Sequence, residues 1–233
     1  MKIKSRTHFN QLRNLQPFAL LDTKKLDVLI DKLGEKKYAP GEHIIVQGDR
    51  GDIYYIIKSG KVVVLKKMLT DEPERVATLE EGQGFGEEAL ITSSPRNATV
   101  QAVDETVVWT LSMCDFICTL KSTFLDEVNP EDVLSKAKEQ FNYLDVRMQM
   151  EYDEEHIPDA INIPLDELRK RYSELDQSRK YYVYCLVGAR SATAAFLMNS
   201  QGFNAKSIKG GLLNWPGPVE EGNGSVNTSS AST

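Results

Sequence analysis

The spacing of apolar positions changes along the chain, and the first part shows two patterns. From roughly His8 to Leu33, apolar residues recur at helical spacing, and Gly34 follows as the expected C-cap. Short apolar or alternating runs then come between turn residues every ~8–12 positions. These runs are His43–Val46, Ile53–Ile57, Lys61–Met68, Val76–Leu79, Ala98–Val103 and Thr106–Leu111. The pattern predicts an all-β jelly-roll barrel with flanking helices, the last of them over Ser112–Val128.

Strand-like and helix-like segments alternate in the second part. The expected strands are Tyr143–Val146, Ala160–Ile163, Tyr181–Cys185 and Ala205–Ile208. The expected helical segments are Met150–Glu155, Leu165–Leu175 and Ser191–Asn199. Such alternation predicts an α/β domain with a parallel sheet. We therefore expect a first domain over residues 1–129, a connecting helix over 130–140, a second domain over 141–218 and a disordered Gly/Asn/Ser/Thr-rich tail over 219–233.

Composition narrows the choice of partners. The 233 residues carry a net charge of −6, with 17 Lys/Arg against 19 Asp/Glu in residues 1–129 and 11 against 15 in residues 130–233. Neither part is basic, which argues against a nucleic-acid partner. No apolar run reaches the length of a membrane span, and the start of the chain lacks the pattern of a secretory signal. A cytoplasmic protein whose three cysteines stay free is expected.

The segment from Tyr181 to Ser191 carries the strongest chemical signal. An apolar strand ends in Cys185, and a short turn leads into a helix with Arg190 near its start. Such a turn points backbone N–H groups inward as an anion-binding nest, and the helix adds its positive end. Gly188 allows the tight bend. These surroundings favour the thiolate, which is the nucleophilic form of cysteine.

The spacing Cys185-x-x-Gly188-x-Arg190-Ser191 resembles the active-site loop of the rhodanese family. Four further segments agree with that family in order: Leu144–Arg147, Glu151–Tyr152, His156–Pro164 and Lys209–Trp215. The resemblance implies a thiosulfate or persulfide sulfurtransferase in which Cys185 takes a sulfane sulfur from a donor, holds it as a persulfide and passes it to a thiol acceptor. Related phosphatases have a cysteine loop one residue longer, so the loop length favours sulfur over phosphate.

The resemblance also assigns roles around Cys185. Arg190 is expected to anchor either the loop or the charge of the donor, and Asp145 and Arg147 to support the site. The N–H groups expected to stabilise the anionic sulfur belong to Leu186, Val187, Gly188, Ala189 and Arg190. Some thiosulfate-active members carry a basic residue where this loop has Leu186 and Val187, which argues against strong thiosulfate affinity but not against persulfide chemistry. His156 is expected to be structural.

A second constellation lies between Gly84 and Val100. Glu87 and Glu88 are placed in the first turn of a short helix, whose start presents unpaired N–H groups. Arg96 follows a short loop and can return toward the same groups. A carboxylate beside an arginine and free amides suits a ligand with both a hydroxyl and a phosphate group.

The runs Phe85-Gly86-Glu87-x-Ala89-Leu90 and Pro95-Arg96-x-Ala98-Thr99-Val100 resemble the phosphate-binding cassette of cyclic-nucleotide-binding domains. The resemblance implies that Glu87 binds the ribose 2′-hydroxyl and that Arg96 binds the cyclic phosphate, with backbone amides near Ala89 and Asn97 completing the site. The candidate nucleotide-binding residues are Gly86, Glu87, Glu88, Ala89, Arg96, Asn97 and Ala98. Cyclic AMP is expected ahead of cyclic GMP.

Two features of this half stay open. The lid over the base is expected from Glu131–Gln140, from the second domain or from a partner chain, so a homodimer remains an alternative. Cys114 and Cys118 are four residues apart in a predicted helix without further ligands at metal spacing. We expect them to pack as small hydrophobic side chains, and we expect no metal site.

Together these patterns predict a sulfurtransferase regulated by cyclic nucleotide. No Gly/Ser-rich linker separates Ser112–Val128 from the strand at Tyr143, so coupling between the domains is expected. Two independent domains are one alternative. A nucleotide sensor whose Cys185 serves as a persulfide or redox relay without turnover is another. A transcription factor of the catabolite-activator type is excluded, because no helix-turn-helix segment or basic face is present.

Overall fold

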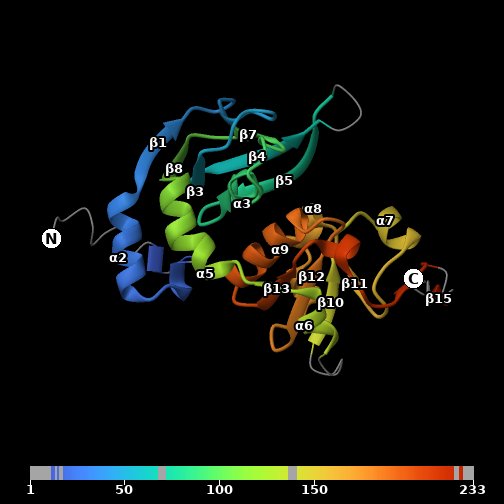
Figure 1. The fold of residues 1–233 in the computed structure, drawn as a ribbon. Coiled ribbons are helices and arrows are strands. Elements are labelled where there is room, and N and C mark those ends of the chain that lie inside the picture. The colour runs from blue at the N-terminus through green and yellow to red at the C-terminus, as the bar shows by residue number, and fades with distance from the viewer. Residues whose placement is uncertain are drawn as a thin grey trace. The chain divides into compact units, whose positions relative to one another are not determined.

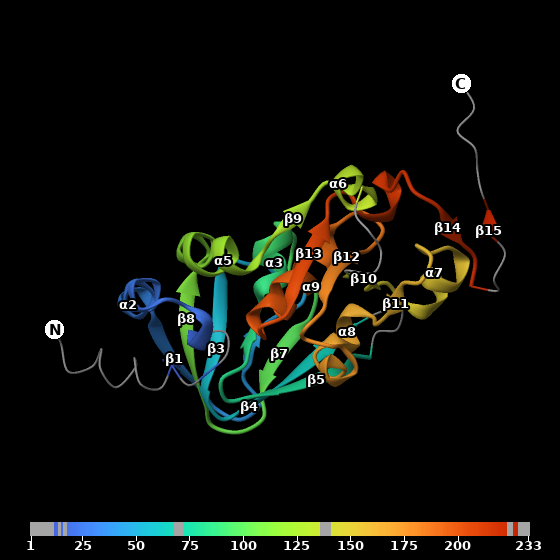
Figure 2. The same ribbon diagram turned by 90° about the horizontal axis from the view of Figure 1, so that it is seen from below.

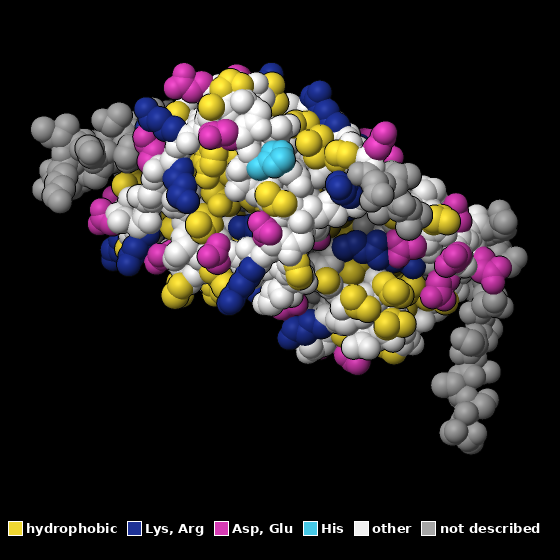
Figure 3. Space-filling model, turned by 90° about the horizontal axis from the view of Figure 1, so that it is seen from above, with side chains coloured by type: hydrophobic (Ala, Val, Ile, Leu, Met, Phe, Trp, Pro, Cys, Tyr) yellow, Lys and Arg dark blue, Asp and Glu magenta, His cyan; other side chains and the backbone are white. Residues whose placement is uncertain are grey.

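The protein divides into two compact units, Met1–Thr123 and Phe124–Thr233 (Figure 1). A computed structural model describes residues 12–13, 15, 18–67, 72–135, 141–222 and 226–227. Among these residues no helix has both the length and the apolar character that a membrane crossing requires. On the face shown in Figure 3, Lys and Arg side chains lie among acidic and apolar ones.

The first unit is a β-barrel of two four-stranded antiparallel sheets, as predicted. One sheet has the order β1 (Gly34–Tyr38), β8 (Thr106–Ser112), β3 (Ile53–Ser59), β6 (Gly84–Phe85). The other has the order β2 (His43–Ile45), β7 (Thr99–Ala102), β4 (Lys61–Lys66), β5 (Glu74–Glu80). Inward-facing residues of both sheets, among them Ile57, Val62 and Val108, form one buried apolar cluster.

Helices flank this barrel, and their ends differ from the prediction. The described helical elements are η1 (Phe18–Leu20), α2 (Thr23–Lys32), α3 (Glu87–Thr92) and the continuous run α4 (Met113–Phe116), η2 (Ile117–Lys121), α5 (Ser122–Phe124). α2 begins late because Asp22 caps it, accepting the backbone N–H of Lys25 at 2.8 Å. Gly34 is not a helix cap but opens β1, which pairs with β8. Residues 8–11, 14, 16 and 17 of the expected first helix lie outside the described residues.

The second unit is an α/β domain with a five-stranded parallel sheet. Its strand order is β11 (Ile161–Asn162), β10 (Phe141–Asp145), β12 (Lys180–Tyr184), β13 (Asn204–Ile208), β9 (Glu127–Val128). The helical elements are α6 (Pro130–Leu134), α7 (Gln149–Glu154), α8 (Leu165–Leu168), η4 (Tyr172–Glu174), α9 (Ala189–Ser200) and η5 (Gly211–Asn214). Figure 2 shows the same elements from below.

Alternate residues of β10 and β12 enter different cores on the two faces of this sheet. Leu144 and Val183 join a cluster that includes Ala194 and Met198 of α9. Their neighbours Tyr143, Tyr182 and Tyr184 join another cluster, together with Val133, Ile208 and Trp215. Because side chains alternate across a strand, this is the pattern of a sheet buried on both faces.

The edge strand β9 was not predicted. Glu127 and Val128, expected to end a helix, instead pair in parallel with Ser207 and Ile208 of β13. The helix that begins at Pro130 ends at Leu134, and Val133 is fully buried in the core of the second unit. The expected connecting helix over 130–140 is therefore a short element of that unit as far as Ser135, and residues 136–140 lie outside the described residues.

The predicted disorder from residue 219 onward is wrong at its start. β14 (Val219–Glu220) pairs with β15 (Val226–Asn227), and Glu220 exchanges two backbone hydrogen bonds of 2.8 Å with His156. Gly222 also donates its N–H to the carbonyl oxygen of Asp153 at 2.9 Å. Residues 223–225 and 228–233 of the expected tail lie outside the described residues.

After β13 the chain turns back onto the end of β12 through two glycines. Leu212 donates its backbone N–H to the carbonyl oxygen of Cys185 at 2.8 Å. Gly211 has φ of +60°, and a Cβ at this position would lie 2.1 Å from the same carbonyl oxygen. Only glycine permits this approach, so the segment holds the backbone at the carboxyl edge of the sheet.

We predict that Gly211→Ala destabilises the second unit by at least ~2 kcal/mol more than Gly202→Ala, because overpacking a close contact costs ~1–3 kcal/mol. Gly202 is a matched control, since it also has positive φ, +89°, but a Cβ added there would meet no atom within 4 Å. Urea unfolding followed by Trp215 fluorescence, with both variants in a Trp109→Phe background, measures the difference. Equal losses of stability in the two variants would show that the short distance between Gly211 and the carbonyl oxygen of Cys185 does not determine the effect of the substitution.

Candidate functional site

Cys185 lies directly after β12, at the carboxyl edge of the parallel sheet, and is fully buried. Gly188, in the left-handed region with φ of +96°, turns the chain and caps α9. Its backbone N–H donates to Cys185 Sγ at 3.2 Å. The expected turn is therefore present, with this N–H directed at the sulfur, while the side chains of Leu186, Val187 and Ala189 are exposed.

One buried serine lies beside the sulfur, and a second buried serine contacts the first. Cys185 Sγ is 3.8 Å from Ser191 Oγ, and Ser191 Oγ is 2.9 Å from Ser207 Oγ. Ser191 also donates to the carbonyl oxygen of Gly188 at 3.0 Å. Sequence reasoning included Ser191 only as part of a motif and missed Ser207, because no local pattern marks a serine on β13 as a neighbour of the loop.

Arg190 ties the loop to α7. Its two terminal nitrogens donate to the two carboxylate oxygens of Glu151, each at 2.7 Å. Glu151 also accepts the backbone N–H of Met148 at 3.0 Å, so the same carboxylate caps α7. The hydrogen bond from Arg190 lowers the pKa of Glu151 to about 2. The pKa of Arg190 is raised, first by Glu151 and further by the nearby Cys185 side chain.

Asp145 and Arg147 form a buried ion pair one strand away from the loop. Arg147 donates to Asp145 through its backbone N–H at 2.9 Å and through a terminal nitrogen at 2.7 Å. Asp145 lies opposite Tyr184, the residue before Cys185. Burial, followed by the charge of Asp145, raises the pKa of Tyr184 above its usual value. The pair thus contacts the strand that carries Cys185 and does not contact the sulfur in any described hydrogen bond.

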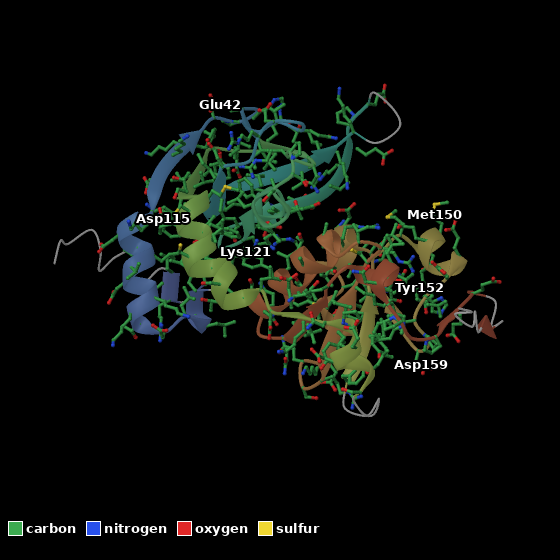
Figure 4. The ribbon with its side chains drawn as sticks, viewed as in Figure 1. Glu42, Asp115, Lys121, Met150, Tyr152 and Asp159 are labelled. Carbon is green, nitrogen blue, oxygen red and sulfur yellow. The ribbon has the colours of Figure 1, made fainter. Side chains whose placement is uncertain are left out.

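His156 has structural contacts. Its Nδ1 lies 2.8 Å from the carbonyl oxygen of Tyr152, and its ring stacks on the Tyr152 ring at 3.7 Å. Its Nε2 lies 3.3 Å from the carboxylate of Glu220. Figure 4 shows Tyr152 on the inner side of α7 and Met150 at its outer side.

The predicted phosphate cassette folds back on itself around Arg96. Gly86, with φ of +84°, caps α3, and Glu87 begins that helix with its side chain buried. The Arg96 guanidinium is also buried and donates to the carbonyl oxygens of Gly86 and Ile53, each at 2.7 Å. Burial lowers the pKa of Arg96, and none of the ion pairs within the described part of the chain involves it.

The other cassette residues lie around this core. The Asn97 side-chain amide donates to the Glu88 carboxylate at 2.5 Å, and Asn97 is exposed. Ala89 and Ala98 are buried. Beyond the predicted set, Lys121 of η2 donates to the carbonyl oxygen of Ile91 in α3 at 3.1 Å. No spacing in the sequence indicates that contact.

The two remaining cysteines do not pack as expected. Cys114 and Cys118 are both exposed on the helix that follows β8, whereas Cys185 is buried. The prediction that they act as small core residues is wrong, because the buried face of this helix is formed by Phe116, Thr119 and Leu120. Within the described ranges, no three His, Cys, Asp or Glu side chains are grouped as metal ligands.

Comparison with known proteins identifies a different family in each of the two parts of the chain. The cyclic nucleotide-binding domain family matches residues 35–122, and the rhodanese-like domain family matches residues 129–217. The type II regulatory subunit of cAMP-dependent protein kinase from Drosophila melanogaster is 32% identical over 151 residues, which are 61% of this chain and 39% of that protein. YrkF of Bacillus subtilis, named as a sulfur carrier, is 41% identical over 85 residues, 36% of this chain and 46% of that protein.

Solved structures with a related fold include a protein kinase subunit. The regulatory subunit of a cAMP-independent protein kinase A from Trypanosoma brucei gives a TM-score of 0.50 at 26% identity, over 59% of this chain and 48% of that one. The chain spans less than half the length of these relatives. The two family matches follow one another along the chain. The first corresponds to the barrel and the second to the domain with the parallel sheet, so the chain consists of a cyclic nucleotide-binding domain followed by a rhodanese-like domain.

Proposed function

We propose that the protein is a sulfurtransferase that moves sulfane sulfur through a persulfide on Cys185 and is regulated by a cyclic nucleotide, cyclic AMP ahead of cyclic GMP. The observation that carries the sulfur-transfer part is the Gly188 N–H, which donates to Cys185 Sγ at 3.2 Å in a loop closed by Arg190 and Glu151. A backbone donor directed at sulfur stabilises an anion there.

The transfer proceeds in two displacements. The Cys185 thiolate attacks the sulfane sulfur of the donor, so that an Sγ–S bond forms while the bond from that sulfur to the donor breaks and its electron pair leaves with the donor. A thiolate acceptor then attacks the outer sulfur, and Cys185 leaves as the thiolate. Arg190 positions the loop, and Gly188 holds the negative charge in both steps. Ser191 lies close enough, at 3.8 Å, to orient Sγ.

The nucleotide part rests on Arg96. A buried cation without a carboxylate in an ion pair is costly, and an anionic ligand relieves that cost. A guanidinium has five N–H donors, and the two carbonyl bonds of Arg96 leave donors for a cyclic phosphate. Glu87, beside it on α3, supplies the carboxylate for a ribose hydroxyl. Because Asn97 is held by Glu88, we assign it no contact with the base, which favours cyclic AMP.

We expect coupling between the two activities to run along the chain, through the segment that leads from the first unit into the second. Lys121 links the cassette helix α3 to the run α4–η2–α5 through the carbonyl oxygen of Ile91. That run ends at Phe124, whose carbonyl oxygen accepts the side-chain amide of Asn199 at 2.8 Å. Asn199 belongs to α9, the helix that begins at the Cys185 loop. A shift of the cassette upon nucleotide binding therefore has a route to the sulfur-transfer loop.

We predict that a sulfane-sulfur donor adds one sulfur to Cys185 and none to Cys114 or Cys118, because only Cys185 receives a loop N–H. Peptide mass spectrometry maps the adduct, and release of thiocyanate on addition of cyanide measures turnover. The adduct is expected to persist in a Cys114→Ser/Cys118→Ser variant and to disappear in Cys185→Ser. An adduct retained by Cys185→Ser would overturn the assignment, and an adduct without turnover would favour a sensor with a non-turnover relay.

We predict that Arg96→Ala weakens cyclic AMP binding at least ~30-fold, since removing one member of a desolvated charge pair costs ~2–5 kcal/mol. Isothermal titration calorimetry with cyclic AMP and cyclic GMP provides the measurement. Arg75→Ala is the matched control, because Arg75 is an exposed arginine of the same domain on β5. Arg96→Lys retains the charge and should bind with intermediate affinity. Absence of binding by the wild type would make the barrel purely structural.

We predict that the free and the persulfidated protein differ in nucleotide affinity by ~5–150-fold, with the same factor for the equilibrium of sulfur loading onto Cys185 with and without nucleotide, because coupling between two sites is reciprocal. Lys121→Met should retain nucleotide binding and reduce the coupling, whereas Lys36→Met, on exposed β1, should leave it unchanged. Equal values in both comparisons, with unchanged turnover, would establish two independent domains.

A further inference from the structure

The charge of the loop arginine is already neutralised at the entrance to Cys185. Both terminal nitrogens of Arg190 are bound to Glu151 at 2.7 Å, and the pair is only about one-third exposed. Arg190 is the one cation of the loop 186–190. Once Cys185 is the thiolate, these three groups together carry a net charge of −1. These side chains therefore add no net attraction for a dianion beyond that of the loop N–H groups.

The rim of the entrance to Cys185 is formed by exposed apolar side chains, which carry no charge. Val187 in the loop is 58% exposed, and Leu186 beside it is also exposed. Leu213 of η5, 68% exposed, is joined to Leu186 by a backbone hydrogen bond of 3.1 Å. Lys209, which precedes this rim on the chain, is solvent-exposed, and no ion pair within the described residues joins its side chain to the loop.

We infer that the sulfur donor of Cys185 is an organic, at most monoanionic sulfane-sulfur compound with an apolar group next to the sulfur, and not the thiosulfate dianion. This rests on the proposed sulfurtransferase function and names its substrate class. Leu186, Val187 and Leu213 are then specificity-determining residues, because they bury the apolar group of the donor. Glu151 has a second role, because its carboxylate neutralises the charge of Arg190 that would otherwise attract a dianion.

Three sulfur donors distinguish the effect of apolar contact on transfer from the effect of charge. Benzenethiosulfonate and methanethiosulfonate are monoanions that differ in the apolar group, and thiosulfate is a dianion without one. With each donor the Cys185 thiolate takes the outer sulfur, the S–S bond to the oxidised sulfur breaks, and a sulfinate or sulfite leaves with the electron pair. Cyanide then removes the outer sulfur as thiocyanate and restores the thiolate. Dividing kcat/KM by the rate of the same donor with free cysteine removes differences in intrinsic reactivity.

The normalised kcat/KM of the wild type is expected to fall from benzenethiosulfonate to methanethiosulfonate by ~5-fold or more, since burying part of a phenyl ring contributes about 1 kcal/mol. It should fall again for thiosulfate. Val187→Lys should raise the value for thiosulfate by ~3-fold or more and lower it for benzenethiosulfonate, because a new exposed charge contributes up to ~1 kcal/mol. Glu151→Gln should raise the thiosulfate value in the same way by releasing Arg190.

The matched control is Val28→Lys, which adds the same charge at a valine that is 53% exposed on α2 of the first unit, and it should change none of the ratios. Thermal unfolding of each variant verifies folding, and the order of the three donors on the wild type does not depend on any variant. The inference is overturned if thiosulfate equals or exceeds benzenethiosulfonate on the wild type, or if Val187→Lys and Glu151→Gln leave the ratios unchanged. Loss of turnover with all three donors would instead overturn the sulfurtransferase function itself.

Discussion

Leu212 donates its backbone N–H to the carbonyl oxygen of Cys185, and this 2.8 Å bond sets where β12 stops and the loop begins. Gly211 allows the approach, because any side chain there would meet the same carbonyl oxygen. With the strand end held, Gly188 can turn the chain so that its N–H meets the sulfur. The backbone at the carboxyl edge of the sheet is thus constrained before any side chain acts on the substrate.

Side chains from distant elements then hold the rest of the loop. Arg190 is bound to Glu151 of α7, and Ser191 to Ser207 of β13. Asp145 and Arg147 fix the neighbouring strand through a fully buried ion pair. Such preorganisation matters because donors that are already directed at the sulfur need not reorganise when charge develops on it.

The two domains use an arginine in opposite ways. Arg96 is buried, and its two described hydrogen bonds go to carbonyl oxygens, which orient the guanidinium without forming an ion pair with it. Arg190 forms an ion pair with a carboxylate that cancels its charge, so its role is to connect the loop to α7. Under the proposed function, the same residue type favours a phosphate ligand in one domain and an apolar sulfur donor in the other. The difference lies in the partner and not in the arginine.

The amino-acid sequence by itself determined the local features: six barrel strands, the alternation of the second domain, and the two motifs around Arg96 and Cys185. These follow from the period of apolar residues and from glycines at turns, which act over a few positions. Tertiary structure alone decided that Glu127–Val128 is a strand, that Cys114 and Cys118 are exposed, and that Glu151 binds Arg190. A strand of two residues has no measurable period, and the partner of an arginine 39 positions away is chosen by the packing of the sheet and not by its neighbours along the chain.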